Sequence, residues 1–450
     1  MLNLLNKINS FVWGAPTLLL IFFTGVVLSL RTGFFQITHF KVAFKTFFKK
    51  SQTQNGKKLT PFQSASTALS ATMGTGNIVG VAGAITLGGA GAVFWMWVSA
   101  IVCMIIKFSE IALSVRYREQ TPDGACSGGA MYYIKNALPK IFSPLSIIFC
   151  ICGVAAAFGV GNLTQINTMS NSISSLVNHI FPLLPYQNLI LKLLVGFICA
   201  SICFFVLKND RSIGQFCAKI FPVMTFSYIG MTALAISINF NKIPSAFWQI
   251  FVGAVNPKCV TGGAIGSAFV AVRFGMSRGV FSNESGLGTA PIAYACSEGD
   301  EISLGLMGII EVFIDTIVVC TLTALTILCA GEISYGIDTA SLITLNALTS
   351  ALGKNVIFIF CPVVCFFAFS SVVGWGLYGA KFFTFLFGEK NKNIFLTLFI
   401  LAQIPAAVFR ADAVWVIAEI FNGLMCIPNI TALLFLTNEI ADIIGAYKAK

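Results

Sequence analysis

The chain has 450 residues, of which 57% are hydrophobic and only 10% are charged, and its mean hydropathy is +0.87. Because soluble domains carry about 25% charged residues, this composition excludes a water-soluble domain and predicts a protein solvated mainly by lipid. The net charge of +11 would suit nucleic-acid binding, but the basic residues cluster in short loops between apolar runs. This placement is typical of charges that orient a protein in the membrane.

Eleven apolar segments follow one another, which predicts about eleven transmembrane helices in a single membrane domain covering residues 1–450. The first is long for a signal-peptide core and no small-residue cleavage site follows it, so we expect it to be retained. The segments are 11–30, 61–86, 91–115, 143–178, 188–207, 213–240, 262–297, 303–330, 355–386, 393–409 and 412–442.

Basic residues mark alternate ends of these segments. Residues 31–60 hold seven of them, and the positive-inside rule makes this loop cytoplasmic. Alternation across eleven spans then predicts a bacterial inner-membrane protein with its N-terminus outside and its C-terminus inside. The later clusters agree with this orientation, and they are Arg116 with Arg118, Lys135 with Lys140, Lys208 with Arg211, Lys390 with Lys392, and Lys448 with Lys450.

Two smaller features complete the outline. The stretch 244–261 contains aromatic residues, proline and lysine, and we expect a short helix lying along the outer surface. The 14 cysteines are scattered within apolar runs without zinc-type spacing, which indicates small buried side chains.

The second apolar segment contains glycines where a continuous helix is not expected. Residues 70–80 read SATMGTGNIVG, with Gly74 and Gly76 flanking a threonine in mid-segment. A break here would expose free N–H groups that suit a carboxylate and free carbonyls that suit a sodium ion, and such groups must line an enclosed cavity. The alternative is close helix packing through Gly76 and Gly80.

The seventh segment is interrupted more strongly. Residues 273–291 contain four glycines, two arginines and a glutamate, which are incompatible with a lipid-facing helix. We expect a second broken helix, and the alternative is a long cytoplasmic loop. The two interruptions lie five spans apart, which is typical of two inverted five-helix halves, here 61–240 and 262–442, preceded by one additional span at 11–30.

Several motifs resemble those of the alanine/glycine:cation symporter family, and the resemblance extends over residues ~15–440. It implies an all-α, leucine-transporter-type core of ten helices after one additional N-terminal helix, and sodium-coupled or sometimes proton-coupled uptake of alanine or glycine. The motifs are MGTGNI at 73–78, GAVFWMW at 91–97, KFSE at 107–110, SNESGLG at 282–288, DT at 315–316 with CT at 320–321, and FSSVVGW at 369–375.

The same resemblance implies the site residues. The groups that would contact the amino acid are Thr75, Gly76, Asn77, Gln165, Phe281, Ser282, Asn283 and Trp375, the last capping the pocket and favouring small side chains. Sodium would be held by the carbonyls of Ser70 and Met73 and the hydroxyls of Ser370 and Ser371. Met73, Ser285 and Ser371 depart from the commoner family residues, but the hydroxyl needed at 371 is retained.

The charged residues within the apolar segments have no substrate or sodium contact among these assignments. Glu110 either accepts N–H bonds from the opposite half's broken helix or pairs with Lys107. Glu311 and Asp315, four residues apart, are expected on one helix face, in a structural network rather than in ion coupling. Glu284 is expected to pair with Arg278 or Arg273.

The sequence therefore predicts a secondary transporter that moves a small neutral amino acid, alanine or glycine, into the cell with sodium by alternating access. The alternative is a proton-coupled or other small-amino-acid symporter of the same fold, for serine or D-alanine. No HExxH motif is present, so we expect no enzyme activity, and a channel is disfavoured. The expected partners are the amino acid, sodium and the lipid bilayer, without nucleic acid or an obligate protein partner.

Overall fold

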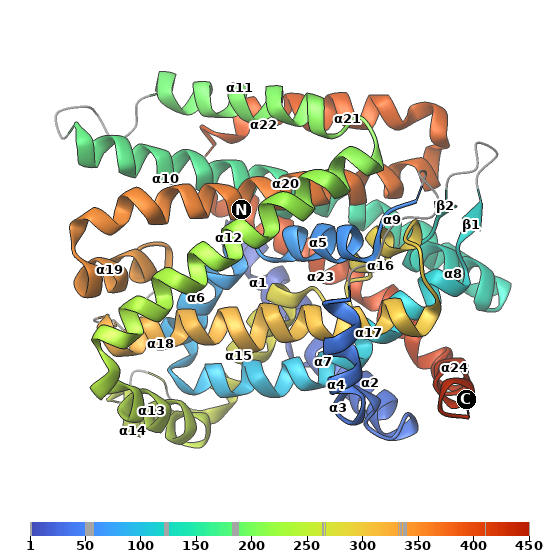
Figure 1. The fold of residues 1–450 in the computed structure, drawn as a ribbon, viewed down its shortest axis with the longest axis horizontal. Helices are drawn as coiled ribbons and strands as arrows, with labels where there is room; N and C mark the ends of the chain where they lie inside the picture. The colour runs from blue at the N-terminus through green and yellow to red at the C-terminus, as the bar shows by residue number, and fades with distance from the viewer. Residues whose placement is uncertain are drawn as a thin grey trace.

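The computed structural model describes residues 2–49, 58–120, 126–181, 189–262, 265, 267–331, 333, 335, 340–409 and 411–449. Most of these residues are helical, and the helices run largely alongside one another (Figure 1). One pair of short antiparallel strands, β1 (Glu119–Gln120) and β2 (Cys126–Ser127), lies at one end of the bundle. Residues 50–57 of the first basic loop lie outside the described residues.

Twelve α-helices lie between the start of the described chain and residue 238. They are α1 (Leu2–Val12), α2 (Ala15–Arg31), α3 (Phe35–Thr38), α4 (Phe40–Phe47), α5 (Pro61–Thr72), α6 (Val79–Gly88), α7 (Gly91–Arg116), α8 (Ala130–Ala137), α9 (Ser143–Phe158), α10 (Thr164–Ile180), α11 (Leu189–Val206) and α12 (Asp210–Ile238).

Twelve further α-helices follow in the described residues after 242. They are α13 (Ile243–Val255), α14 (Pro257–Thr261), α15 (Ala268–Asn283), α16 (Ala290–Ala295), α17 (Glu301–Val312), α18 (Thr321–Ala330), α19 (Ala340–Leu352), α20 (Ile357–Phe387), α21 (Lys392–Leu401), α22 (Gln403–Ala406), α23 (Ala411–Phe435) and α24 (Thr437–Lys448).

Within the described residues, eight helices are long and apolar enough to cross a membrane, and the bent pair α5 and α6 makes a ninth span. Two of the eleven predicted segments are not among these nine. Segment 262–297 is divided between α15 and α16, and segment 393–409 between the short helices α21 and α22. The difference arises because each of these four helices is shorter than the roughly 20 residues that a helix needs to cross the membrane.

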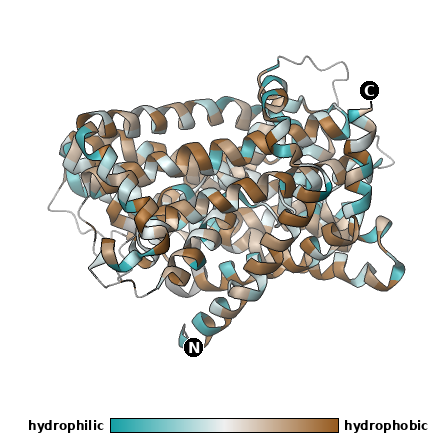
Figure 2. Cartoon of the chain, turned by 90° about the horizontal axis from the view of Figure 1, so that it is seen from below, coloured by the Kyte–Doolittle hydropathy of each residue, from teal (hydrophilic) through white to brown (hydrophobic). Residues whose placement is uncertain are grey.

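The outer faces of the bundle are apolar, as lipid requires. Large hydrophobic side chains remain exposed there, including Ile190, Phe226 and Phe269, which are 78%, 73% and 61% exposed. Figure 2 shows such apolar stretches along the helices, and it shows the N-terminal helix projecting from the body of the protein. An exposed apolar surface on this scale marks a membrane interface rather than a water-facing one.

The predicted break in the second apolar segment is present. α5 begins with a capping box in which Thr60 and Gln63 bond each other's backbone N–H groups, and it ends at Thr72. A single 3-10 turn at Thr75–Asn77 follows, and α6 continues at an angle of 59° to α5. Helix packing alone does not account for this geometry, since the helix axis changes direction here.

The second break is also present, and the alternative of a long loop is wrong because α15 is helical through Asn283. The chain then leaves the helix at Glu284, whose φ of 53° is left-handed, and passes through Gly286 and Gly288 at φ of 90° and 70°. These backbone angles favour glycine. The shorter helix α16 starts at Ala290 with a proline in its first turn.

The two broken helices lie together inside the bundle. α5 packs against α12, α20 and α16, whereas α7 lies between α15 and α17. α5 and α16 are neighbours near the middle of Figure 1. The polar backbone released at each break is therefore enclosed by protein, which is the condition for irregular backbone at membrane depth.

Candidate functional site

The end of α5 meets the middle of α20 through three serines. The hydroxyls of Ser370 and Ser371 each lie 3.2 Å from the carbonyl oxygen of Ser70, and all three residues are fully buried. Met73 is the C-cap residue of this helix. A Cβ atom on the next residue, Gly74, would stand 2.6 Å from the Oγ atom of Ser371. Neutral hydroxyl and carbonyl oxygens converge here, and this donor set fits a hard cation such as sodium.

The first break also contacts the helix that carries Gln165. The Nε2 atom of Gln165 lies 3.4 Å from the hydroxyl of Thr75 and 3.2 Å from the carbonyl of Val160. That carbonyl is available because residues Gly159–Leu163 form a π-helical turn between α9 and α10. The Oε1 atom of Gln165 is buried and has no hydrogen-bond partner within the described part of the chain.

The two breaks meet at Gly76. A Cβ atom on this residue would stand 3.5 Å from the Cα of Ser282 and 3.7 Å from the ring of Phe281. Thr75, Gly76, Gln165, Phe281 and Ser282 therefore come together from α10, α15 and the first break.

The side chain of Asn77 is already hydrogen-bonded within the protein. Its Nδ2 atom donates to the carboxylate of Asp315 at 2.7 Å, and Ser282 and Thr316 donate to the other carboxylate oxygen at 2.8 Å each. Asn283 in turn donates to the hydroxyl of Thr316 at 3.1 Å. Three of the predicted substrate residues thus converge on Asp315 and Thr316, and Asp315 links both broken helices.

Sequence spacing alone did not identify this role of Asp315. Glu311 and Asp315 would share a face of a regular helix, but residues Phe313–Cys320 are π-helical, which changes the register between them. Glu311 accepts a hydrogen bond from Tyr294 on α16, whereas Asp315 accepts its bonds from Asn77, Ser282 and Thr316. The predicted buried network exists, with separate partners for the two carboxylates.

Trp375 on α20 packs against the π-helical turn that precedes Gln165. A Cβ atom on Gly161 would stand 2.2 Å from the Cβ of Trp375, so only glycine admits the tryptophan here. The indole N–H donates to Glu284 at 3.2 Å, and Thr289 donates to the same carboxylate at 2.7 Å. The predicted pairing of Glu284 with Arg278 or Arg273 is wrong, because Arg278 bonds Glu419 at 2.7 Å.

Glu110 braces the second break, which decides between the two interpretations of this residue. Its Oε1 atom accepts the backbone N–H groups of Gly286 at 2.9 Å and Gly288 at 3.1 Å, together with the amide of Asn429. Lys107 is buried nearby, and its Nζ atom has no hydrogen-bond partner among the described residues. The carboxylate binds backbone rather than this lysine.

The cysteines are mostly buried and none forms a disulfide, as their scatter predicted. Cys259 is exposed on α14. Cys320 lies in the central cluster, with its sulfur 3.4 Å from both the Asn77 amide and the Ser282 hydroxyl.

Comparisons with known proteins agree with this geometry. The family model for the sodium:alanine symporter family matches residues 1–450. The sodium/alanine symporter AgcS of Methanococcus maripaludis is 37% identical over 448 residues, which cover 98% of this chain and 96% of that protein. The probable sodium/glutamine symporter GlnT of Bacillus subtilis is 29% identical and covers 98% and 89%.

Among solved structures, MhsT in complex with L-phenylalanine is similar with a TM-score of 0.59 at 15% identity, covering 88% of this chain and 99% of that one. This likeness confirms the all-α, leucine-transporter-type fold. Family and fold are those of carriers, so the chain is not an enzyme, and sodium is its coupling ion. The chain belongs to the sodium:alanine symporter family and is a multi-pass, sodium-coupled amino-acid transporter.

Proposed function

We propose that this transporter carries alanine or glycine into the cell together with sodium by alternating access. The observation that carries the proposal is the close approach of the two breaks, where Gly76 lies against Phe281 and Ser282. A substrate beside these residues would meet Gln165 and the helix of Trp375, and a small side chain would fit best.

The amino acid would bind between the two broken helices. Its carboxylate would lie at the backbone N–H groups released around Thr75, Gly76 and Asn77, where the half-helix α6 begins. Its ammonium would meet the hydroxyl of Ser282 and the Oε1 atom of Gln165, which accepts no hydrogen bond from the residues that the structure describes. Phe281, Asn283 and Trp375 would complete the wall and limit the size of the substrate.

Sodium would bind between α5 and α20, at the carbonyls of Ser70 and Met73 and the hydroxyls of Ser370 and Ser371. The short distances already present between three of these residues support this assignment. Because Gly74 follows directly, an ion at this position fixes the backbone that presents the substrate-binding N–H groups. Binding of sodium and binding of the amino acid are coupled in this way.

We also propose that the chain spans the bacterial inner membrane as one domain, with an additional span at 11–30 and two halves at 61–240 and 262–442. The N-terminus would lie outside and the C-terminus inside. α8, α24 and the two strands gather at one end of the bundle, whereas α13 and α14 lie at the other (Figure 1), as expected for elements on opposite sides of a membrane. Lipid surrounds the bundle, and no obligate protein partner is required.

The test is uptake of radiolabelled alanine into proteoliposomes under an imposed sodium gradient. We expect accumulation that needs sodium and is inhibited by unlabelled glycine. Serine, D-alanine and glutamine complete the competition panel, because a relative is described as a probable sodium/glutamine symporter. Strong inhibition by glutamine without inhibition by glycine would contradict the proposed substrate, and uptake driven by a proton gradient alone would contradict the proposed coupling.

A further inference from the structure

A cavity of about 220 Å³ lies between α1, α15 and α23. Phe281 forms part of its wall, and the same ring lies 3.7 Å from the Cβ position of Gly76 in the first break. The ring therefore separates this cavity from the candidate substrate site. An amino acid that enters from this cavity would meet the Phe281 ring on its way to Gly76.

An ion pair joins the two helices beside this ring. Arg278 on α15 contacts the Oε1 atom of Glu419 on α23 at 2.7 Å, and the two side chains are only 26% and 12% exposed. The guanidinium also lies 5.8 Å from the centre of the Phe281 ring. Separation of α15 from α23 must break this partly buried pair, and a charge left buried without its partner is costly.

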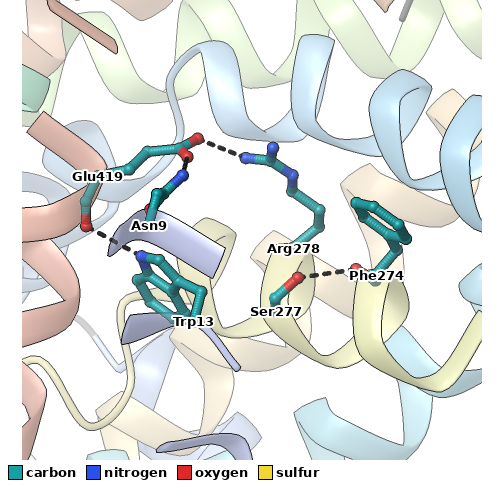
Figure 3. A network of polar contacts seen from close by, with 6 residues as sticks. All are labelled: Asn9, Trp13, Phe274, Ser277, Arg278 and Glu419. Atoms are coloured by element: carbon teal, nitrogen blue, oxygen red, sulfur yellow. Dashed lines mark hydrogen bonds and ion pairs between the residues drawn. The ribbon is translucent and has the colours of Figure 1, made fainter. Parts of the chain in front are cut away.

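The N-terminal helix completes the cluster (Figure 3). Asn9 donates to the Oε2 atom of Glu419 at 2.7 Å, so each oxygen of this carboxylate has its own donor, from Arg278 and from Asn9. The indole N–H of Trp13 donates to the backbone carbonyl of Glu419 at 2.9 Å. The Trp13 ring meets that of Phe281 edge-on at 6.3 Å.

This segment is docked closely on α23. A Cβ atom on Gly423, one turn beyond Glu419, would stand 2.5 Å from Val12 and 2.9 Å from Trp13. Asn9 and Trp13 thus reach the cluster from outside the ten-helix core. The rest of α1 is largely exposed, including Leu4 and Phe11.

We propose that Asn9 and Trp13 are positioning residues for transport: they hold Glu419 for Arg278 and keep Phe281 closed over the first break, so the N-terminal segment must loosen before substrate enters. The proposal rests on the proposed function and on its orientation with the N-terminus outside. A role of Asn9 and Trp13 only in anchoring α1 makes a different prediction, because anchoring leaves access to the site unchanged.

The native thiol of Cys320 reports that access, since it touches Asn77 and Ser282 beneath Phe281 and is buried. The variants are made in a parent transporter that carries Cys259→Ser, because Cys259 is exposed. Intact cells expressing them are treated with a membrane-impermeant methanethiosulfonate without added alanine. Modification of Cys320 is then measured by peptide mass spectrometry. We expect Asn9→Leu to speed modification on the order of tenfold, the effect of losing a hydrogen bond to a carboxylate, and Trp13→Phe to speed it by a smaller factor.

Asn6→Leu is the matched control, because Asn6 lies on the same helix and is exposed. Its Cys320 modification rate should equal that of the Cys259→Ser parent. Asn9→Asp alone places two carboxylates together. Combining it with Glu419→Gln restores one carboxylate beside one amide. The Cys320 modification rate of the double variant should therefore be closer to that of the Cys259→Ser parent than the rate of Asn9→Asp alone.

Equal rates in Asn9→Leu, Trp13→Phe and Asn6→Leu would overturn the proposal. Sodium-dependent alanine uptake is measured on the same variants, which separates this result from a failure of the proposed function. If uptake is sodium-dependent while the rates stay equal, only the positioning role fails. If alanine is not transported but Asn9→Leu still speeds modification, the positioning role stands and the substrate assignment fails.

Discussion

The Oε1 atom of Glu110 accepts the backbone N–H of Gly286 at 2.9 Å, although the two residues are 176 positions apart in the sequence. The same oxygen accepts the N–H of Gly288, and Asn429 donates to it while also bonding the carbonyl of Gly286 at 2.9 Å. The left-handed stretch after α15 is thus supported by side chains from α7 and α23. Without such partners, backbone groups in a membrane interior are costly to bury.

Glu110→Leu should destabilise the protein strongly, because it leaves three buried donors without an acceptor, at about 1–3 kcal/mol for each group. Glu110→Gln should be milder, since it retains an amide oxygen. The measurement is the apparent melting temperature in detergent, with Glu389→Gln at an exposed position as control. A Glu110→Leu variant as stable as the parent would show that this brace contributes nothing.

Gly74→Ala should strongly reduce sodium-driven uptake while leaving the fold intact. The added methyl group would stand 2.6 Å from the Oγ of Ser371 and 3.5 Å from the amide of Gln165, within both proposed sites. Gly80→Ala is the matched control on α6, where no atom lies within 4 Å of the Cβ position. We expect uptake to fall by about tenfold or more in the first variant, from overpacking, and to be unchanged in the second. Equal uptake in both variants would contradict the assignment of the break.

Ser370→Ala and Ser371→Ala should each raise the sodium concentration for half-maximal uptake, by about tenfold for the loss of one ligand. Ser371→Thr keeps the hydroxyl and should remain close to the parent. Ser146→Ala is a buried control, because the hydroxyl of Ser146 donates to the carbonyl of Ser143 on the same helix. Sodium titrations of alanine uptake test this, and sodium dependence unchanged in both alanine variants would remove these serines from the proposed ion site.

Trp375→Leu should broaden the range of substrates. The smaller side chain gives more room beside Gly161 and Gln165, and it also loses the hydrogen bond to Glu284. We expect valine and leucine to become competitors of labelled alanine, while Trp248→Leu, at a 54% exposed position on α13, leaves the competition profile unchanged. A profile restricted to small amino acids in Trp375→Leu would mean that this ring does not set substrate size.

Much of the fold could be predicted from the sequence. The scarcity of charge and the apolar segments identified a multi-pass membrane protein, because hydropathy is a local property of each segment. The two breaks were predictable for the same reason. Gly286 and Gly288 adopt positive φ angles, and Gly74 stands where a side chain would collide with Ser371.

The partners of the buried polar residues were less accessible to sequence reasoning. Asn77 bonds Asp315 across 238 positions, and Arg278 bonds Glu419 across 141 positions rather than the nearby Glu284. Spacing also failed within one helix, because the π-helical segment Phe313–Cys320 changes the register between Glu311 and Asp315.

The sequence by itself determined where the chain enters lipid and where its backbone leaves the helix, since transfer free energy and glycine's conformational freedom act on neighbouring residues. Only the tertiary structure decided which carboxylate serves which break, and that the N-terminal helix reaches the wall formed by Phe281. These contacts depend on how the helices pack, and a buried hydrogen bond forms with the donor that packing brings within reach rather than with the nearest charge in the sequence.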